Sequence, residues 1–203
     1  GIGGPINQLL PLVLAPAVAT RRDEWLRELA DDLDQLEKRV EGFKVEELVK
    51  NEAFVSATIQ ATRIAIGTHQ REKREYLRNA LLNIAKGITS DEIKQQFFLN
   101  AIEVFTPVHI KALNVIWRGG GLKIGWDENS VPIMQRTYGA AIGILAPEVK
   151  GQTSLIGAVL ADLKNRGFSN LGGPDLAYPQ GETITNLGIE FLNFVRSPED
   201  LPR

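Results

Sequence analysis

Hydrophobic positions repeat at helical spacing along most of the first 118 residues. Between Arg22 and Val40 they are separated alternately by three and four positions, which predicts a helix with one buried face. Gly42 follows, and glycine is common just past a helix end because it readily adopts the left-handed backbone region. Two heptads are too few for an independent coiled coil, so we predict a helix within a bundle. Its predicted buried residues are Leu26, Leu29, Leu33, Leu36 and Val40.

A second long helix is predicted from Asn51, a good N-cap residue, to Gly87. Its apolar positions are interrupted by seven polar residues and then resume. Ile66 and Leu77 are 11 residues apart, about three helical turns, so they would share a face of one continuous helix. A break at Gly67 is the alternative, because glycine inside a helix costs about 1 kcal/mol. The first half of the predicted face consists of Val55, Ile59, Thr62 and Ile66.

Two shorter helices are predicted next. Residues 89–92, Thr-Ser-Asp-Glu, form a capping-box sequence, and Thr106-Pro107 places proline at the first position of the following helix. The segment 119–131 is rich in Gly, Asp and Asn and indicates a linker. We therefore predict an apolar, Pro-rich arm over residues 1–20 and a helical bundle over residues 21–118. The buried stripe of the first short helix is predicted at Ile93, Phe97, Ala101 and Val104.

The C-terminal part, residues 132–203, has a different pattern. Helices are predicted over 133–146 and from about 153 to Gly167, the latter with Leu155, Val159 and Leu163 facing inward. Short strands at 168–171 and 183–185 would pair before a closing helix that begins at Asn186. This order resembles a winged helix-turn-helix domain. The matching residues are Leu163, Gly167, Phe168, Ile184, Thr185, Leu187, Gly188 and Phe191.

The winged-helix resemblance implies DNA binding through the second helix, or protein contact through the same surface. It gives the predicted fold class: mainly α, with an N-terminal helical bundle followed by a small winged-helix-like α+β domain.

The layout of the whole chain resembles that of the bacterial abortive-infection protein alpha family, a family of mostly unknown function. The resemblance rests on an apolar start at Gly3-Gly4-Pro5, a charged helix from Arg21 to Leu26, the long segment 51–85 and the winged-helix-like tail. It implies a bacterial intracellular protein connected with phage defence. The family supplies no catalytic residues that could be carried over.

Composition excludes several kinds of chemistry. The 203 residues include no cysteine, which rules out disulfides, thiolate catalysis and Cys-ligated zinc. With 23 Lys and Arg against 25 Asp and Glu, the net charge is −2, which argues against a surface coated in basic residues. The two histidines, His69 and His109, lack the neighbours that a catalytic or metal site needs. We predict no catalytic residues, no cofactor and no metal.

The near-neutral total conceals two oppositely charged segments. Residues 22–52 carry six basic and eleven acidic residues, and residues 61–86 carry six basic and two acidic ones. The basic segment could bind phosphates, or it could face the acidic one within the bundle or across a dimer. The second interpretation is favoured because the two charges are complementary. The candidate contact residues in this segment are Arg71, Lys73, Arg74 and Arg78.

The would-be recognition helix of the winged domain offers only Lys164 and Arg166, opposed by Asp162. Duplex-binding proteins usually neutralise several phosphates, so this charge pattern gives DNA binding little support.

The predicted function is that of a non-enzymatic interaction or regulatory protein with a protein partner, or one that forms a homo-oligomer. One alternative is a DNA-binding regulator that uses Lys164 and Arg166. Another is a membrane-acting effector that uses the arm, whose apolar run Leu9–Ala19 is shorter than the about 20 residues needed to span a bilayer. The predicted location is cytoplasmic, or membrane-associated through this arm.

Overall fold

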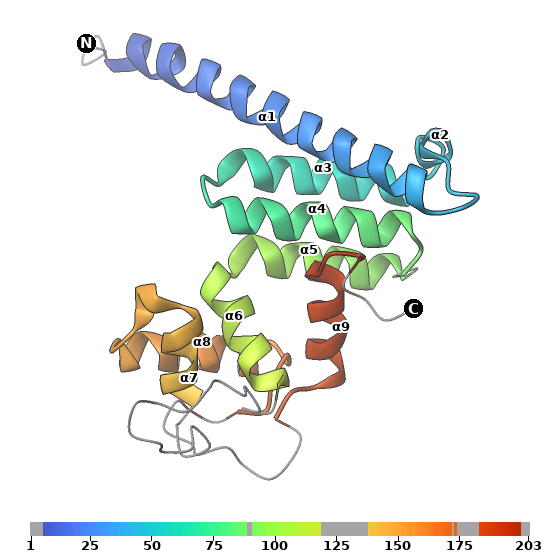
Figure 1. Ribbon diagram of the computed structural model, residues 1–203. Coiled ribbons are helices and arrows are strands. Elements are labelled where there is room, and N and C mark those ends of the chain that lie inside the picture. Colours follow the sequence, from blue (N-terminus) through green and yellow to red (C-terminus); the bar gives the residue numbers. More distant parts are fainter. Residues whose placement is uncertain (1–5, 89–90, 119–137, 172, 174–182, 200–203) are drawn as a thin grey trace. The chain divides into compact units, whose positions relative to one another are not determined.

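The computed structural model is mainly helical, as predicted (Figure 1). It describes residues 6–88, 91–118, 138–171, 173 and 183–199, with side chains from Leu14 onward. The elements are α1 (Ile6–Arg39), α2 (Val45–Leu48), α3 (Glu52–Gly67), α4 (Arg71–Ala85), α5 (Glu92–Val104), α6 (Pro107–Trp117), α7 (Tyr138–Leu145), the 3₁₀ turn η2 (Pro147–Val149), α8 (Thr153–Asn165) and α9 (Asn186–Val195).

The chain divides into two compact units. Unit 1 consists of residues 1–103 and 194–203, and unit 2 consists of residues 104–193. The predicted linker 119–131 lies outside the described residues, so a domain boundary there stays a prediction. The predicted arm is not a separate segment from Ile6 onward, because those residues form the first part of α1.

The C-terminal part of α1 packs on α3 and α4 through Trp25, Leu29, Leu33 and Leu36. Trp25 is fully buried, and its indole N–H donates a hydrogen bond of 3.0 Å to the Thr62 hydroxyl. The prediction that Leu26 lies on this face is wrong, since its side chain is 43% exposed. Trp25, four residues before Leu29, takes the place of Leu26 on the same face, and the predicted positions Leu29, Leu33 and Leu36 are buried.

α3 and α4 form a helical hairpin rather than the single continuous helix predicted from residue 51 onward. α3 ends at Gly67 and α4 begins at Arg71, so the alternative of a break at Gly67 is confirmed. Ile66 and Leu77 therefore do not share a face of one helix. Folding back lets the two apolar faces cover each other, and buried Ala61 permits the close approach seen between the two helices (Figure 1).

Side chains mark the helix starts in unit 1. Asn51 caps α3 as predicted, with its side-chain oxygen accepting the Phe54 N–H at 3.1 Å. At the start of α5, Asp91 accepts the N–H groups of Ile93 and Lys94. The predicted capping residue Thr89 lies outside the described residues.

The buried face of α5 differs from the predicted one. Ile93 is 82% exposed, Phe97 and Val104 are also exposed, and only Ala101 of the predicted stripe is buried. The buried residues are Gln95, Phe98, Leu99, Ala101 and Ile102. Because apolar residues occur on both sides of this helix, their spacing alone did not identify the side that faces the core.

Unit 2 contains a core built around three aromatic rings. Phe105, Phe168 and Phe191 have ring centroids 5.0 to 5.8 Å apart. Gly167 ends α8 with a φ of 80°, as predicted for a residue in the left-handed region. The expectation that Leu155 faces inward is wrong, because this residue of α8 is exposed.

The predicted wing is reduced to a single antiparallel bridge between Ser169 and Ile184. The Asn170 N–H donates to the Thr183 carbonyl at 2.7 Å beside it. No strand occurs in the described residues of 138–199, so the α+β description of this part is replaced by a helical one. Two backbone segments held by so few hydrogen bonds do not make a sheet.

Candidate functional site

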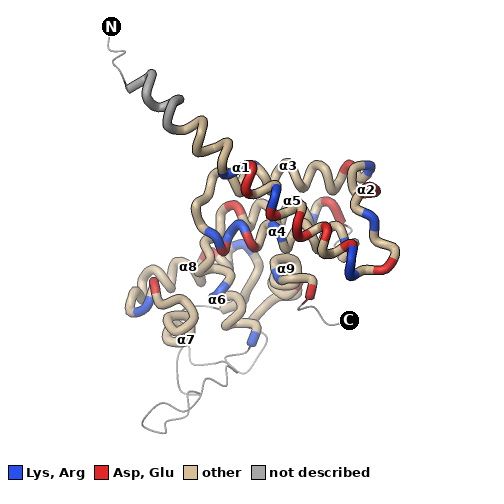
Figure 2. The backbone as a smooth tube through the Cα atoms, turned by 45° about the horizontal axis from the view of Figure 1, so that its top comes forward, with Lys and Arg blue, Asp and Glu red and all other residues tan. Residues whose placement is uncertain are grey.

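The oppositely charged segments meet inside unit 1, where α1 lies along α4 (Figure 2). Arg78 of α4 pairs with Glu28 of α1 and donates a hydrogen bond of 2.8 Å to Asp32. Arg74, one turn earlier, lies 3.8 Å from Glu24. We call this set of five residues the acidic–basic seam.

The acidic–basic seam leaves two of the predicted contact residues, Arg74 and Arg78, little able to bind a phosphate. The side chains of Arg74 and Arg78 are only 18% and 19% exposed. Both are engaged by carboxylates of the same chain, so their charge is largely neutralised where a phosphate would have to approach. The interpretation that the basic and acidic segments face each other within the bundle holds for these two arginines.

The other two predicted contact residues of α4 lie differently. Arg71 is exposed at the start of the helix. Lys73 donates a hydrogen bond of 2.5 Å to the backbone carbonyl of Glu103. Burial lowers the pKa of Lys73 from its ordinary value, while the carboxylate of Glu103 raises it. Arg71 is therefore exposed, whereas Lys73 is half-buried and hydrogen-bonded. The structure does not bring the four predicted residues together as one basic patch.

In unit 2, Lys164 and Arg166 are both exposed at the end of α8. Arg166 donates a hydrogen bond of 2.9 Å to Asp162 and lies over the Phe105 ring, 5.7 Å from its centroid. The opposition of Asp162, expected from the sequence, is thus a direct ion pair. Only part of the charge of Arg166 is left for a ligand.

His109 belongs to the same part of unit 2. Its Nδ1 accepts the Thr106 N–H at 3.1 Å, and its ring stacks on Phe105. Its Nε2 lies 3.5 Å from a carboxylate oxygen of Asp162. The imidazole therefore completes the cap of α6.

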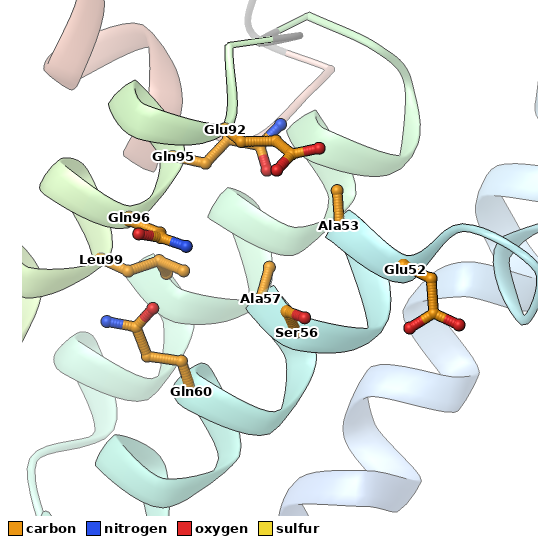
Figure 3. Close-up of a pocket in the computed structure, with 9 residues that line it drawn as sticks. All are labelled: Glu52, Ala53, Ser56, Ala57, Gln60, Glu92, Gln95, Gln96 and Leu99. Carbon is orange, nitrogen blue, oxygen red and sulfur yellow. The ribbon is translucent and has the colours of Figure 1, made fainter.

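Unit 1 also has a small cleft, which lies between α3 and α5 (Figure 3). Hydrogen bonds join Gln60 to Asn100 at 2.7 Å and Arg63 to Glu103 at 3.3 Å. Both pairs are 40 residues apart, so the two helices run in the same direction at a constant register. α4 connects them in the opposite direction, which leaves the cleft between two parallel helices.

The cleft has a volume of about 170 Å³ and a largely polar lining. Ala53, Ala57 and Leu99 contribute its apolar surface, and glutamine side chains come from both helices, whereas the Glu52 side chain points away from the other lining residues (Figure 3). The lining residues are Glu52, Ala53, Ser56, Ala57, Gln60, Glu92, Gln95, Gln96 and Leu99. We call this feature the α3–α5 cleft.

Large apolar side chains are also exposed on α3 and α5, outside the lining of the α3–α5 cleft. Ile93 and Phe97 lie one turn apart on the outward side of α5, and Ile59 is exposed on α3. The sequence analysis assigned Ile93 and Phe97 to the core, so it missed this surface. The signal that could have found it is the second apolar face of the same helix, formed by Phe98, Leu99 and Ile102.

The described residues contain no group of three or more His, Asp or Glu side chains arranged to hold a metal ion. His69 lies exposed in the connection between α3 and α4. Among the described helices, none is both long enough and apolar enough to cross a bilayer. Comparisons of the chain with protein-family models, curated proteins and solved structures find no match.

Proposed function

We propose that this protein is a non-catalytic interaction protein, and that unit 1 binds a protein partner over the α3–α5 cleft. The observation that carries the proposal is the exposure of Ile93 and Phe97 on α5, the helix that lines one side of the cleft. Protein interfaces commonly combine an apolar centre with a polar rim, and aromatic residues are enriched in them.

The shape of this surface favours a helical segment of the partner. Two parallel helices with a cleft between them resemble the grooves that accept an amphipathic helix. A helix laid over the cleft and the outward side of α5 would bury its apolar side chains against Ile93 and Phe97. A basic side chain on it would approach Glu52 and Glu92, which are both exposed and lie at the same end of the cleft.

The acidic–basic seam also supports a protein partner, because it makes nucleic-acid binding by α4 less favourable. Arg74 and Arg78 are committed to contacts with α1, so this part of α4 offers little positive charge to nucleic acid. The layout that resembles the abortive-infection family adds a bacterial phage-defence setting to the proposal.

Site-specific photo-crosslinking in cells tests the proposal. A benzophenone amino acid at position 93 should give defined protein adducts, whereas the same group at position 49 should not. Val49 is the matched control because it is also an exposed apolar residue of unit 1, outside the cleft. An adduct of twice the mass of the chain would identify the partner as a second copy.

A second variant checks that the adducts report this surface. Ile93→Glu should abolish co-purification of the crosslinked partner, and Val49→Glu should retain it. A strictly monomeric chain in light scattering, together with equal or absent crosslinking at positions 93 and 49, would refute the proposal.

A further inference from the structure

The first part of α1 extends beyond the other described helices of unit 1 (Figure 1). α1 is 34 residues long, more than twice the length of α4, and it continues past the ends of α3 and α4 (Figure 1). Trp25 is the first residue of α1 described as buried. From Leu14 to Thr20 all residues but the half-buried Ala19 are exposed, so the helix leaves the bundle before this tryptophan.

The exposed turns are apolar on every side. Leu14, Ala15, Pro16, Ala17 and Val18 are five consecutive exposed residues. Because each residue of an α-helix is turned by about 100° from the one before, five in a row point in all directions around the axis. A helix that is hydrophobic all round belongs inside a large protein core or inside a membrane.

Charge and proline content give independent support for lipid. Residues 1–20 contain no charged side chain, and the charges of α1 begin at Arg21 and Arg22, where the helix reaches the bundle (Figure 2). Pro11 and Pro16 both lie within the helix. Proline is disfavoured inside helices of water-soluble proteins but is more frequent in helices that lie in membranes.

We infer that the part of α1 from Ile6 to Thr20 inserts into a lipid bilayer and holds unit 1 at the membrane surface. At 1.5 Å per residue this part is about 22 Å long, which is less than the about 30 Å thickness of a hydrocarbon core. Arg21 and Arg22 then lie at the level of the headgroups. Arg21 donates a hydrogen bond of 3.3 Å to the Ile66 carbonyl, which fixes the helix to the bundle at this level.

A second copy of the chain is a weaker candidate for covering these turns. Pairing of two helices requires an apolar stripe with polar residues elsewhere, and it covers only one side of each helix. The five exposed residues from Leu14 to Val18 show no polar side. Lipid surrounds a helix completely, and it is therefore the occupant that fits.

Flotation of the full chain with phosphatidylcholine vesicles tests this inference. Uncharged vesicles are used because the acidic residues of α1 would oppose binding to anionic lipid. The wild-type chain should float with the vesicles. Leu14→Glu combined with Val18→Glu should lower the bound fraction at least about tenfold, since a carboxylate is costly in the hydrocarbon region.

The matched control is Val49→Glu combined with Ile88→Glu. Val49 and Ile88 are 75% and 43% exposed, against 55% and 45% for Leu14 and Val18, and they lie outside α1. This control should float like the wild type, and circular dichroism melting should show that both double variants remain folded. The inference is overturned if the wild-type chain does not float, or if both double variants lose binding equally. It is also overturned if light scattering shows a dimer that Leu14→Glu with Val18→Glu dissociates while vesicle binding is absent.

Discussion

The acidic–basic seam should stabilise unit 1 measurably, and Arg78 is the residue with which to test it. Glu28 and Asp32 are four residues apart on α1, so they lie on the same side of the helix and repel each other. Arg78 contacts both carboxylates and is only 19% exposed. Replacing it with Met would keep most of the aliphatic stem while removing the charge that offsets this repulsion.

The expected loss is about 1.5–2 kcal/mol in the free energy of unfolding. An exposed ion pair contributes about 0.2–1 kcal/mol, and Arg78 makes two contacts in a partly screened position. The matched control is Arg71→Met, the same substitution on the same helix at an exposed position, which should cost less than about 0.5 kcal/mol.

Urea unfolding followed by circular dichroism measures both losses. With a slope of about 2 kcal/mol per molar urea, Arg78→Met should lower the midpoint by about 0.8 M. In 1 M NaCl the Debye length shrinks to about 3 Å, so the loss should become smaller. Equal midpoints for Arg78→Met and Arg71→Met, or a loss that salt leaves unchanged, would refute the assignment of stability to this seam.

Three further predictions follow from single contacts. Trp25→Ala should cost about 3–5 kcal/mol in urea unfolding and Leu26→Ala less than about 1 kcal/mol, because only the indole is buried; equal costs would contradict the observed face of α1. Gly188→Ala should unfold unit 2, since a Cβ atom there would lie 2.2 Å from the Phe168 carbonyl oxygen; a native-like melting curve would disprove this close approach. Burial, with Glu72 and Glu75 nearby, raises the pKa of Tyr76 from 10.0 to about 12. An ultraviolet titration step from this phenol should therefore appear near pH 12, and that step should be absent in Tyr76→Phe. The stability linked to Tyr76 is complete below pH 10 and is lost as the pH rises toward 12.

Local features of the sequence determined the helices and many of their ends. Asn51 predicts the start of α3 because its side chain can accept a backbone N–H, and Thr106-Pro107 predicts the start of α6 in the same local way. Gly42 adopts the positive φ expected of it, and α8 stops just before Gly167 as expected. These features depend on residues within one or two turns, so no knowledge of the rest of the chain is needed.

Which side of a helix is buried depended on its neighbours. In α1 the core side includes Trp25 rather than Leu26, and in α5 it includes Phe98 rather than Phe97. In each case apolar residues stand next to each other, so two faces have similar hydrophobicity. Only the positions of the neighbouring helices show which of the two faces is buried. The exposed face of α5 could therefore be identified only from the tertiary structure.

An acidic and a basic segment in one nearly neutral chain, and the lack of charge in residues 1–20, can be read from the residues alone. That Arg74 and Arg78 face α1 follows from the packing, because the break at Gly67 turns α4 back along the bundle. Leu14 and Val18 remain exposed because none of the other described helices of unit 1 extends that far along α1 (Figure 1). Residue types fix what each side chain can bind, whereas the meeting of groups distant in sequence depends on how the helices pack.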